Sequence, residues 1–121
     1  MANAVVWFDI PTTSLDRAIG FYSAVLGQKV EKQEISPGCH IGVLPHGKDD
    51  VSGCLFQDVD AKPSDCGPLL YLNVAGRLDA AIAEVQKNGG KVLQPKHQIG
   101  PWGFRAVILD SEGNRVALHS D

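Results

Sequence analysis

The sequence contains little cysteine. Its three cysteines, Cys39, Cys54 and Cys66, are an odd number, and no two of them have C-x-x-C spacing. A disulfide framework and a C-x-x-C redox or zinc motif therefore have no support. We expect three reduced thiols, with Cys54 packed as a small apolar side chain because it lies in an apolar run.

The sequence also lacks a strong charge of either sign and a long apolar run. With 11 basic and 14 acidic residues its net charge is −3, and no basic cluster predicts a nucleic-acid interface. No apolar run is long enough to cross a bilayer. The start, MANAVVWFDIP, lacks the charged and apolar regions of a signal peptide, so we expect a cytoplasmic protein.

The clearest local pattern is an amphipathic helix ending at Leu26. Its apolar residues follow helical spacing: Leu15, Ala18, Ile19, Tyr22 and Leu26. Ser14 is expected to cap the start through its hydroxyl, and Gly27 to end the helix in a left-handed conformation.

Shorter patterns predict strands around this helix and around a second one. The first half reads as a strand, the helix and three strands: Ala4–Ile10, 14–26, Gln28–Ile35, His40–Leu44 and Val51–Phe56. The second half repeats this order: Leu69–Val74, Leu78–Lys87, Lys91–Leu93, Phe104–Leu109 and Arg115–His119. We expect Gln94–Gly103, with two prolines and two glycines, to be a loop.

Two short matches support an internal duplication. LDRAI at 15–19 returns 63 residues later as LDAAI, and LGQKV at 26–30 is answered by NGGKV at 88–92. We therefore predict an α+β fold of two tandem βαβββ modules in one domain, 1–121. Module one covers about 1–57, a linker 58–67, and module two about 68–121. Each helix should cover one face of a four-stranded sheet and leave a cupped face open.

Three segments together carry a resemblance to a known family: SLDRAIGFYSAVLG, LDAAIAEVQKNGGKV and FRAVILDSEGNRVAL. They resemble the vicinal oxygen chelate superfamily, which includes glyoxalase I, bleomycin-resistance proteins and extradiol dioxygenases. The last segment is similar to the family's closing hairpin, with Ser111 in a position often held by proline. The resemblance covers the whole chain and implies the paired-module fold. It specifies function poorly, because this fold supports many chemistries.

The resemblance also implies where metal ligands would stand. Carried over to this chain, those positions fall on Trp7, on Leu69, on Ala117 and within Ser52–Cys54. Indole and alkyl side chains cannot ligate a divalent cation, and one thiol would not suffice. We therefore expect a site with no metal and no cofactor.

Strand alternation places a mixed aromatic and polar set on the open face of the sheets. The predicted ligand-binding residues are Trp7, Asp9, Tyr71, Asn73, Trp102, Arg115 and His119. Asp9 and His119 are the candidates for acid or base chemistry, but Asp9 could instead pair with Arg115 or cap a turn, and His119 could be a half-exposed strand end. Trp102 is a ligand wall, a core plug or a dimer contact. His46 and His97 are expected in solvated loops.

Three functions fit these patterns. The first is a metal-free small-molecule-binding protein of the bleomycin-resistance type, working as a homodimer as the resemblance implies. The second is a glyoxalase-like lyase or isomerase that uses Asp9 or His119, or a metal site that the carried-over positions miss. The third is a structural subunit. None involves nucleic acid or membrane.

Overall fold

The computed structural model describes residues 3–121 and contains two α-helices and eight strands. The first half comprises β1 (Trp7–Pro11), α1 (Leu15–Leu26), β2 (Glu31–Ser36), β3 (Cys39–Val43) and β4 (Ser52–Phe56). The second half comprises β5 (Leu70–Asn73), α2 (Leu78–Lys87), β6 (Lys91–Gln98), β7 (Phe104–Leu109) and β8 (Arg115–Ser120). A short 3₁₀ helix, Gly100–Trp102, separates β6 from β7.

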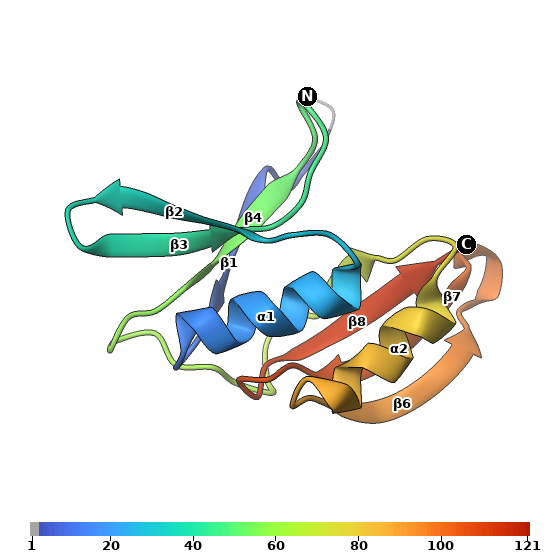
Figure 1. The fold of residues 1–121 in the computed structure, drawn as a ribbon. Coiled ribbons are helices and arrows are strands. Elements are labelled where there is room, and N and C mark those ends of the chain that lie inside the picture. Colours follow the sequence, from blue (N-terminus) through green and yellow to red (C-terminus); the bar gives the residue numbers. More distant parts are fainter. Residues whose placement is uncertain (1–2) are drawn as a thin grey trace.

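The strands form two four-stranded mixed sheets with the same topology (Figure 1). Their orders are β1-β4-β3-β2 and β5-β8-β7-β6. In each sheet the first strand pairs in parallel with the last, and the remaining pairs are antiparallel. This repetition confirms the predicted α+β fold of two βαβββ units.

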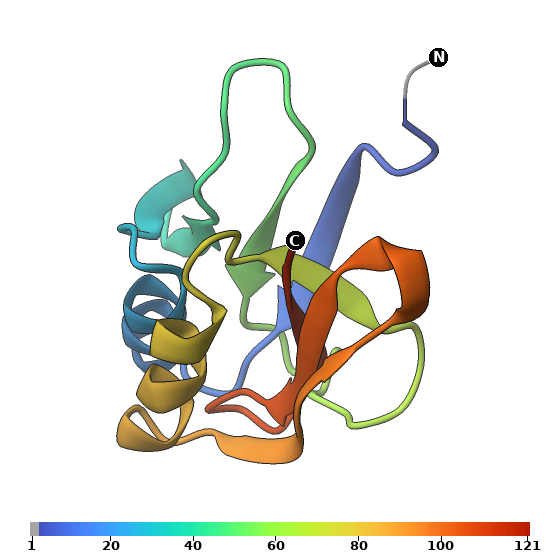
Figure 2. The ribbon, with the colours of Figure 1, turned by 90° about the vertical axis from the view of Figure 1, so that its right-hand side faces the viewer.

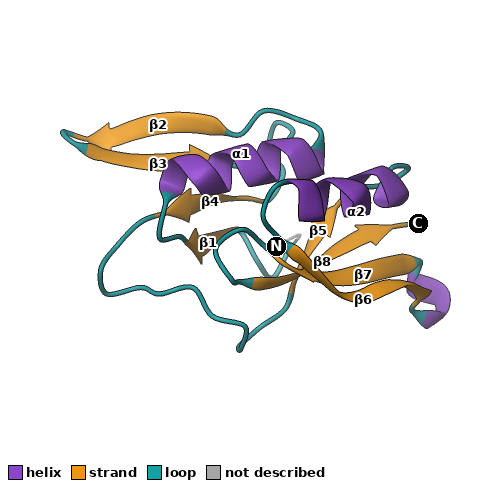
Figure 3. Ribbon diagram, turned by 60° about the horizontal axis from the view of Figure 1, so that its bottom comes forward, coloured by secondary structure: helices purple, strands orange, loops and turns teal. Residues whose placement is uncertain are grey.

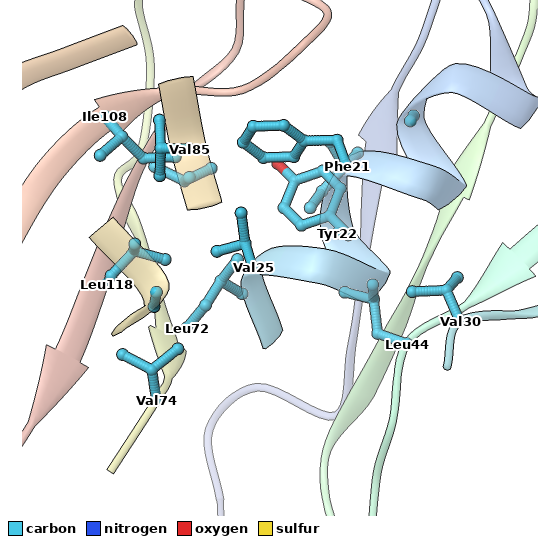
Figure 4. Packing of buried hydrophobic residues seen from close by; sticks show 14 of the residues in the cluster. Phe21, Tyr22, Val25, Val30, Leu44, Leu72, Val74, Val85, Ile108 and Leu118 are labelled. Carbon is cyan, nitrogen blue, oxygen red and sulfur yellow. The ribbon is translucent and has the colours of Figure 1, made fainter. Parts of the chain in front are cut away.

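Both helices lie on one side of the strands (Figures 2 and 3). They contact each other, and their apolar stripes join residues of both sheets in one core. Figure 4 shows Tyr22 and Val25 of α1 in the same cluster as Leu72 and Leu118 of the second sheet. Within residues 3–121, neither helix is long and apolar enough to span a membrane.

The turn between β7 and β8 binds the start of α1, and here the prediction for Ser14 is wrong. The Ser14 side chain makes no capping hydrogen bond. A carboxylate from the other module replaces it: Glu112 Oε1 accepts from the backbone N–H of Thr13 at 2.9 Å and of Ser14 at 2.8 Å. Gly27 does end the helix in the left-handed conformation, with φ of 70°.

Three predicted boundaries are also wrong, and one of them is that of the strand predicted from Gln28, which begins at Glu31. The first strand begins at Trp7, because β1 pairs with β4 only from the Trp7–Ser52 position onward. The strand predicted at Lys91–Leu93 continues to Gln98, so the predicted loop is half strand. Two register irregularities around Gln94 and before His97 accommodate Pro95, which has no N–H to donate to the ladder.

Candidate ligand-binding face

Each sheet has one face covered by the helices and one face that they leave uncovered, which we call its open face (Figure 3). Phe8 and Ile10 of β1 belong to the helix-covered core. Because side chains alternate along a strand, Trp7 and Asp9 point to the open face. Trp7 is 46% exposed there, and Tyr71 of β5 is 47% exposed on the open face of the second sheet.

On the first sheet, a carboxylate is held by two neighbours. The Trp7 indole N–H donates to Asp9 Oδ1 at 2.9 Å, and the Cys54 thiol donates to the same oxygen at 3.3 Å. Asp9 and Cys54 are side by side because β1 and β4 pair at these residues. Burial, with the hydrogen bond to Asp9, raises the pKa of Cys54 to about 12. Cys54 is therefore a neutral thiol at physiological pH and a poor nucleophile.

Asp9 thus makes neither of the contacts considered from the sequence. Among residues 3–121 it forms no ion pair with Arg115 or any other cation. Arg115 begins β8 and shares its face with His119. Arg115 stands four residues from His119, about 13 Å along the strand, so these two side chains do not meet at one point.

On the second sheet, Tyr71 and His119 come together. Their rings are 6.3 Å apart in an edge-on arrangement. Asn73 pairs with His119 across β5 and β8, and its side-chain oxygen accepts the N–H of Ala75 at the end of the strand. The backbone carbonyl of Trp102 accepts a 2.5 Å hydrogen bond from His119 Nε2. The Trp102 residue itself is 75% exposed, so it does not plug the core.

Two members of this group, Arg105 and His97, were not predicted from the sequence. Arg105 Nε donates to His97 Nε2 at 3.0 Å, and its Nη1 donates to the Tyr71 hydroxyl. His97 was assigned to a loop, and Arg105, although it lies in the correctly predicted strand Phe104–Leu109, has no local signal that sets it apart. Alternation along β6 would not have placed His97, because two register irregularities interrupt it, and only the pairing of His97 with Arg105 puts both on the open face. The prediction of a solvated loop is correct for His46, which is exposed between β3 and β4.

A cavity of about 750 Å³ lies where the two modules meet. Tyr71 and Asn73 line it from β5, and Ser52 and His46 from the β4 side. Leu26, Leu44 and Leu72 supply apolar wall, and the Ser52 hydroxyl lies 3.1 Å from His46 Nδ1. Polar and apolar residues share its walls about equally, and a volume of this size admits a small organic molecule that carries polar groups.

The donor set on the open faces does not suit a divalent metal. Trp7, Leu69 and Ala117 offer no ligating atom. At Ser52–Cys54 the thiol is protonated, and the adjacent carboxylate of Asp9 would be the sole anionic ligand. Between residues 3 and 121, no three His, Cys, Asp or Glu side chains are grouped as a metal site would require. A metal-free face therefore remains our prediction.

Two repeated βαβββ units, with one open face each, define the class of paired-module α+β proteins. The sequence profile of the Glyoxalase/Bleomycin resistance protein/Dioxygenase superfamily matches residues 4–118. The chain belongs to this superfamily.

Relatives by sequence carry glyoxylase names. A glyoxylase-like domain-containing protein of Didymella fabae is 34% identical over 121 residues, covering 91% of this chain and 88% of that protein. The Mycobacterium bovis protein CFP32, whose name marks it as a candidate glyoxylase, is 29% identical over 111 residues. The match covers 92% of this chain and 41% of CFP32, so the chain spans about two fifths of that relative.

Solved structures share the fold at low identity. A glyoxalase/bleomycin resistance protein from Albidiferax ferrireducens superposes with a TM-score of 0.74 at 16% identity, covering 98% of this chain and 99% of that one. A glyoxalase I variant from Zea mays has a TM-score of 0.72 at 20% identity, covering 94% of this chain and 44% of that one. These likenesses establish the fold and leave the ligand open.

Proposed function

We propose that the chain binds a small organic molecule, without a metal ion, on the open faces and in the cavity between its modules. The observation that carries the proposal is the cavity of about 750 Å³ lined by Tyr71 and Asn73, two of the residues expected to bind ligand. Exposed aromatic rings at Trp7, Tyr71 and Trp102 supply the surface on which a planar molecule stacks.

A thermal-shift screen of small organic molecules tests this function, because a ligand that binds only the folded state raises its stability. A hit should show smaller shifts in Trp7→Ala and Tyr71→Ala, while Val59→Ala, which truncates an 88% exposed side chain in the linker, should leave the shift unchanged. Equal shifts in all variants would place the ligand elsewhere.

A glyoxalase-like lyase or isomerase is the second candidate, and the geometry favours His119 over Asp9 as its acid or base. A carbonyl oxygen only accepts, so His119 must carry its proton on Nε2 to bond Trp102. Nδ1 is then left to exchange a proton with a ligand. Asp9 has only Oδ2 for this purpose, because Oδ1 already accepts from the Trp7 indole and the Cys54 thiol. The names of the relatives also point to this chemistry.

Formation of lactoylglutathione from methylglyoxal and glutathione is the direct assay. Activity that persists in chelator and is lost in His119→Phe, but not in His40→Phe, which changes an exposed residue of β3 outside the cavity, would establish the enzyme. Inactivity of the unmodified protein, with and without added divalent metal, would exclude this reaction.

We also propose that the chain works as a homodimer in the cytoplasm. Val5 and Val6 are apolar side chains, 54% and 77% exposed, that stand beside the edge strand β1, where a second copy would cover them. The three free cysteines, two of them exposed, suit a reducing compartment. Light scattering should give twice the mass of the chain, and a monomer at micromolar concentration would contradict the dimer.

A further inference from the structure

Four polar side chains stand in one row across the second sheet. Strand register pairs Asn73 of β5 with His119 of β8, His119 with Arg105 of β7, and Arg105 with His97 of β6. Residues paired in this way project to the same face. The neighbouring row contains Tyr71, Ala117, Val107 and Gln94. Such a row puts four hydrogen-bonding side chains at one level of the open face.

The direction of each hydrogen bond in this row can be assigned. An arginine only donates, so His97 Nε2 must accept from Arg105 Nε and cannot carry a proton. The proton of His97 is then on Nδ1, which lies 2.9 Å from the carbonyl of Pro95 and donates to it. The Tyr71 oxygen likewise accepts from Arg105 Nη1. Two neutral acceptors therefore orient the guanidinium.

The positive charge of Arg105 is oriented but not neutralised. Within the described part of the chain, the ion pairs of Arg17, Lys32, Lys87 and Lys96 each use a carboxylate, and Arg105 has none. Its Nη2 group makes no hydrogen bond there either. A cation held partly buried by neutral groups, with donors left over, favours an anion that accepts two parallel hydrogen bonds.

The two central residues of the neighbouring row are apolar and covered by their surroundings, whereas Tyr71 at its end is 47% exposed. Ala117 is fully buried and Val107 is 2% exposed, both on the open-face parity of β8 and β7. The Tyr71 ring rises next to them, with the Arg105 guanidinium 5.8 Å from its centroid and the edge of His119 on another side. An aromatic ring can pack against the exposed part of Tyr71 while its charged end reaches Arg105.

We propose that the row Asn73–His119–Arg105–His97 is an oxyanion site and that the ligand of this chain is an aromatic carboxylate. The carboxylate binds the free edge of the Arg105 guanidinium, and its ring packs against Tyr71. This inference rests on the proposed small-molecule-binding function and adds the chemical class of the ligand.

Three probes of one shape and different charge test the inference: 2-naphthoate, neutral 2-naphthamide and cationic 2-naphthylmethylammonium, each titrated calorimetrically into the full chain. We expect naphthoate to bind at least about tenfold more tightly than the other two, as one charge-assisted hydrogen-bonded pair predicts. Arg105→Gln should abolish this preference, and Arg105→Lys should retain part of it.

Controls separate a lost charge contact from a lost fold. Lys87→Gln removes a cation from exposed α2 and should leave the preference unchanged. If the Arg105→Gln variant binds naphthamide as tightly as the unmodified protein does, the substitution has left the face intact. Equal binding of naphthoate and naphthamide, or a preference that survives Arg105→Gln, overturns the inference and leaves small-molecule binding standing. Failure of all three probes at millimolar concentration counts against the inference and the proposed function together.

Discussion

Asp9 and His119 have equal standing in the sequence, as single titratable residues near strand ends, but they have different surroundings in the fold. Asp9 accepts from an indole and a thiol that the β1–β4 register places beside it. His119 is oriented by one backbone carbonyl and has a ring nitrogen left over. The difference depends on partners 45 and 17 residues away in the chain, so no local pattern could reveal it.

The three cysteines should differ in reactivity. Cys54 is buried with a pKa of about 12, whereas Cys39 and Cys66 are exposed. Because the thiolate is the nucleophile, iodoacetamide at pH 8 should modify Cys39 and Cys66 in the native protein and Cys54 only after denaturation. Peptide mass mapping checks this. Rapid native labelling of Cys54 would mean that the Asp9–Cys54 contact is open in solution.

Glu112 should make stability depend on pH. Burial alone would raise its pKa, but hydrogen bonds from Arg17, Ser14, Ser111 and Thr13 lower the pKa from 4.5 to about 2. Between pH 4.5 and pH 2 the unfolded state binds more protons than the folded state. The contribution of Glu112 to the free energy of unfolding is therefore complete above pH 4.5 and is lost as the pH falls toward 2.

Replacing Glu112 by Gln should therefore lower the free energy of unfolding at pH 7 by about 1–2 kcal/mol, the range of a lost helix cap with its charge. Urea denaturation at pH 7 and near pH 2.5 measures the difference between the two proteins. The difference should shrink at the lower pH. Glu84→Gln, on α2, is the control. An equal difference at both pH values would contradict the role of the carboxylate.

Among the elements, the helices follow their sequence patterns most closely and β6 departs most. Both helices have an apolar stripe and a glycine at or just beyond the end, and α2 occupies the predicted range Leu78–Lys87. β6 contains Pro95 and two register irregularities, so its alternation is broken. Its strand conformation comes from hydrogen bonds to β7, which supplies the regular half of the hairpin.

Gly20 within α1 and Gly27 just after its end should respond oppositely to alanine. Gly20 lies mid-helix with no atom within 4 Å of a new Cβ, so Gly20→Ala should stabilise the chain by about 0.5–1 kcal/mol. Gly27 has φ of 70°, and its Cβ would lie 2.8 Å from Arg77 Cζ, so Gly27→Ala should destabilise by about 1 kcal/mol or more. Chemical denaturation measures both. Changes of the same sign would contradict the assigned helix end.

At the scale of the molecule, the two modules are interlocked. Tyr22 of α1 donates a 2.6 Å hydrogen bond to Asp110, and Arg17 pairs with Glu112 at 2.7 Å. Asn114 Nδ2 donates to the carbonyl of Pro11 at 2.8 Å. The same turn thus holds the strand end, the helix start and the helix middle of the first module. Together with the common core, these contacts predict that neither module unfolds alone.

The two tryptophans report on this, because Trp7 belongs to the first module and Trp102 to the second. Fluorescence of Trp102→Phe follows the first module, and that of Trp7→Phe follows the second. For each variant, unfolding is followed by fluorescence and by circular dichroism. The two transitions should coincide. A tryptophan signal that changes before the circular dichroism would show that the modules unfold separately.

The sequence by itself determined the two helices, the repeated element order and hence the family fold, because helical periodicity and glycine stops are local signals. It also placed Trp7, Asp9, Tyr71 and His119 on the open faces, since alternation is a local property of a strand. Tertiary structure alone decided which of these side chains meet. The Arg105–His97–Tyr71 contacts and the capping of α1 by Glu112 need strand register and module packing, which bring together residues up to 99 positions apart.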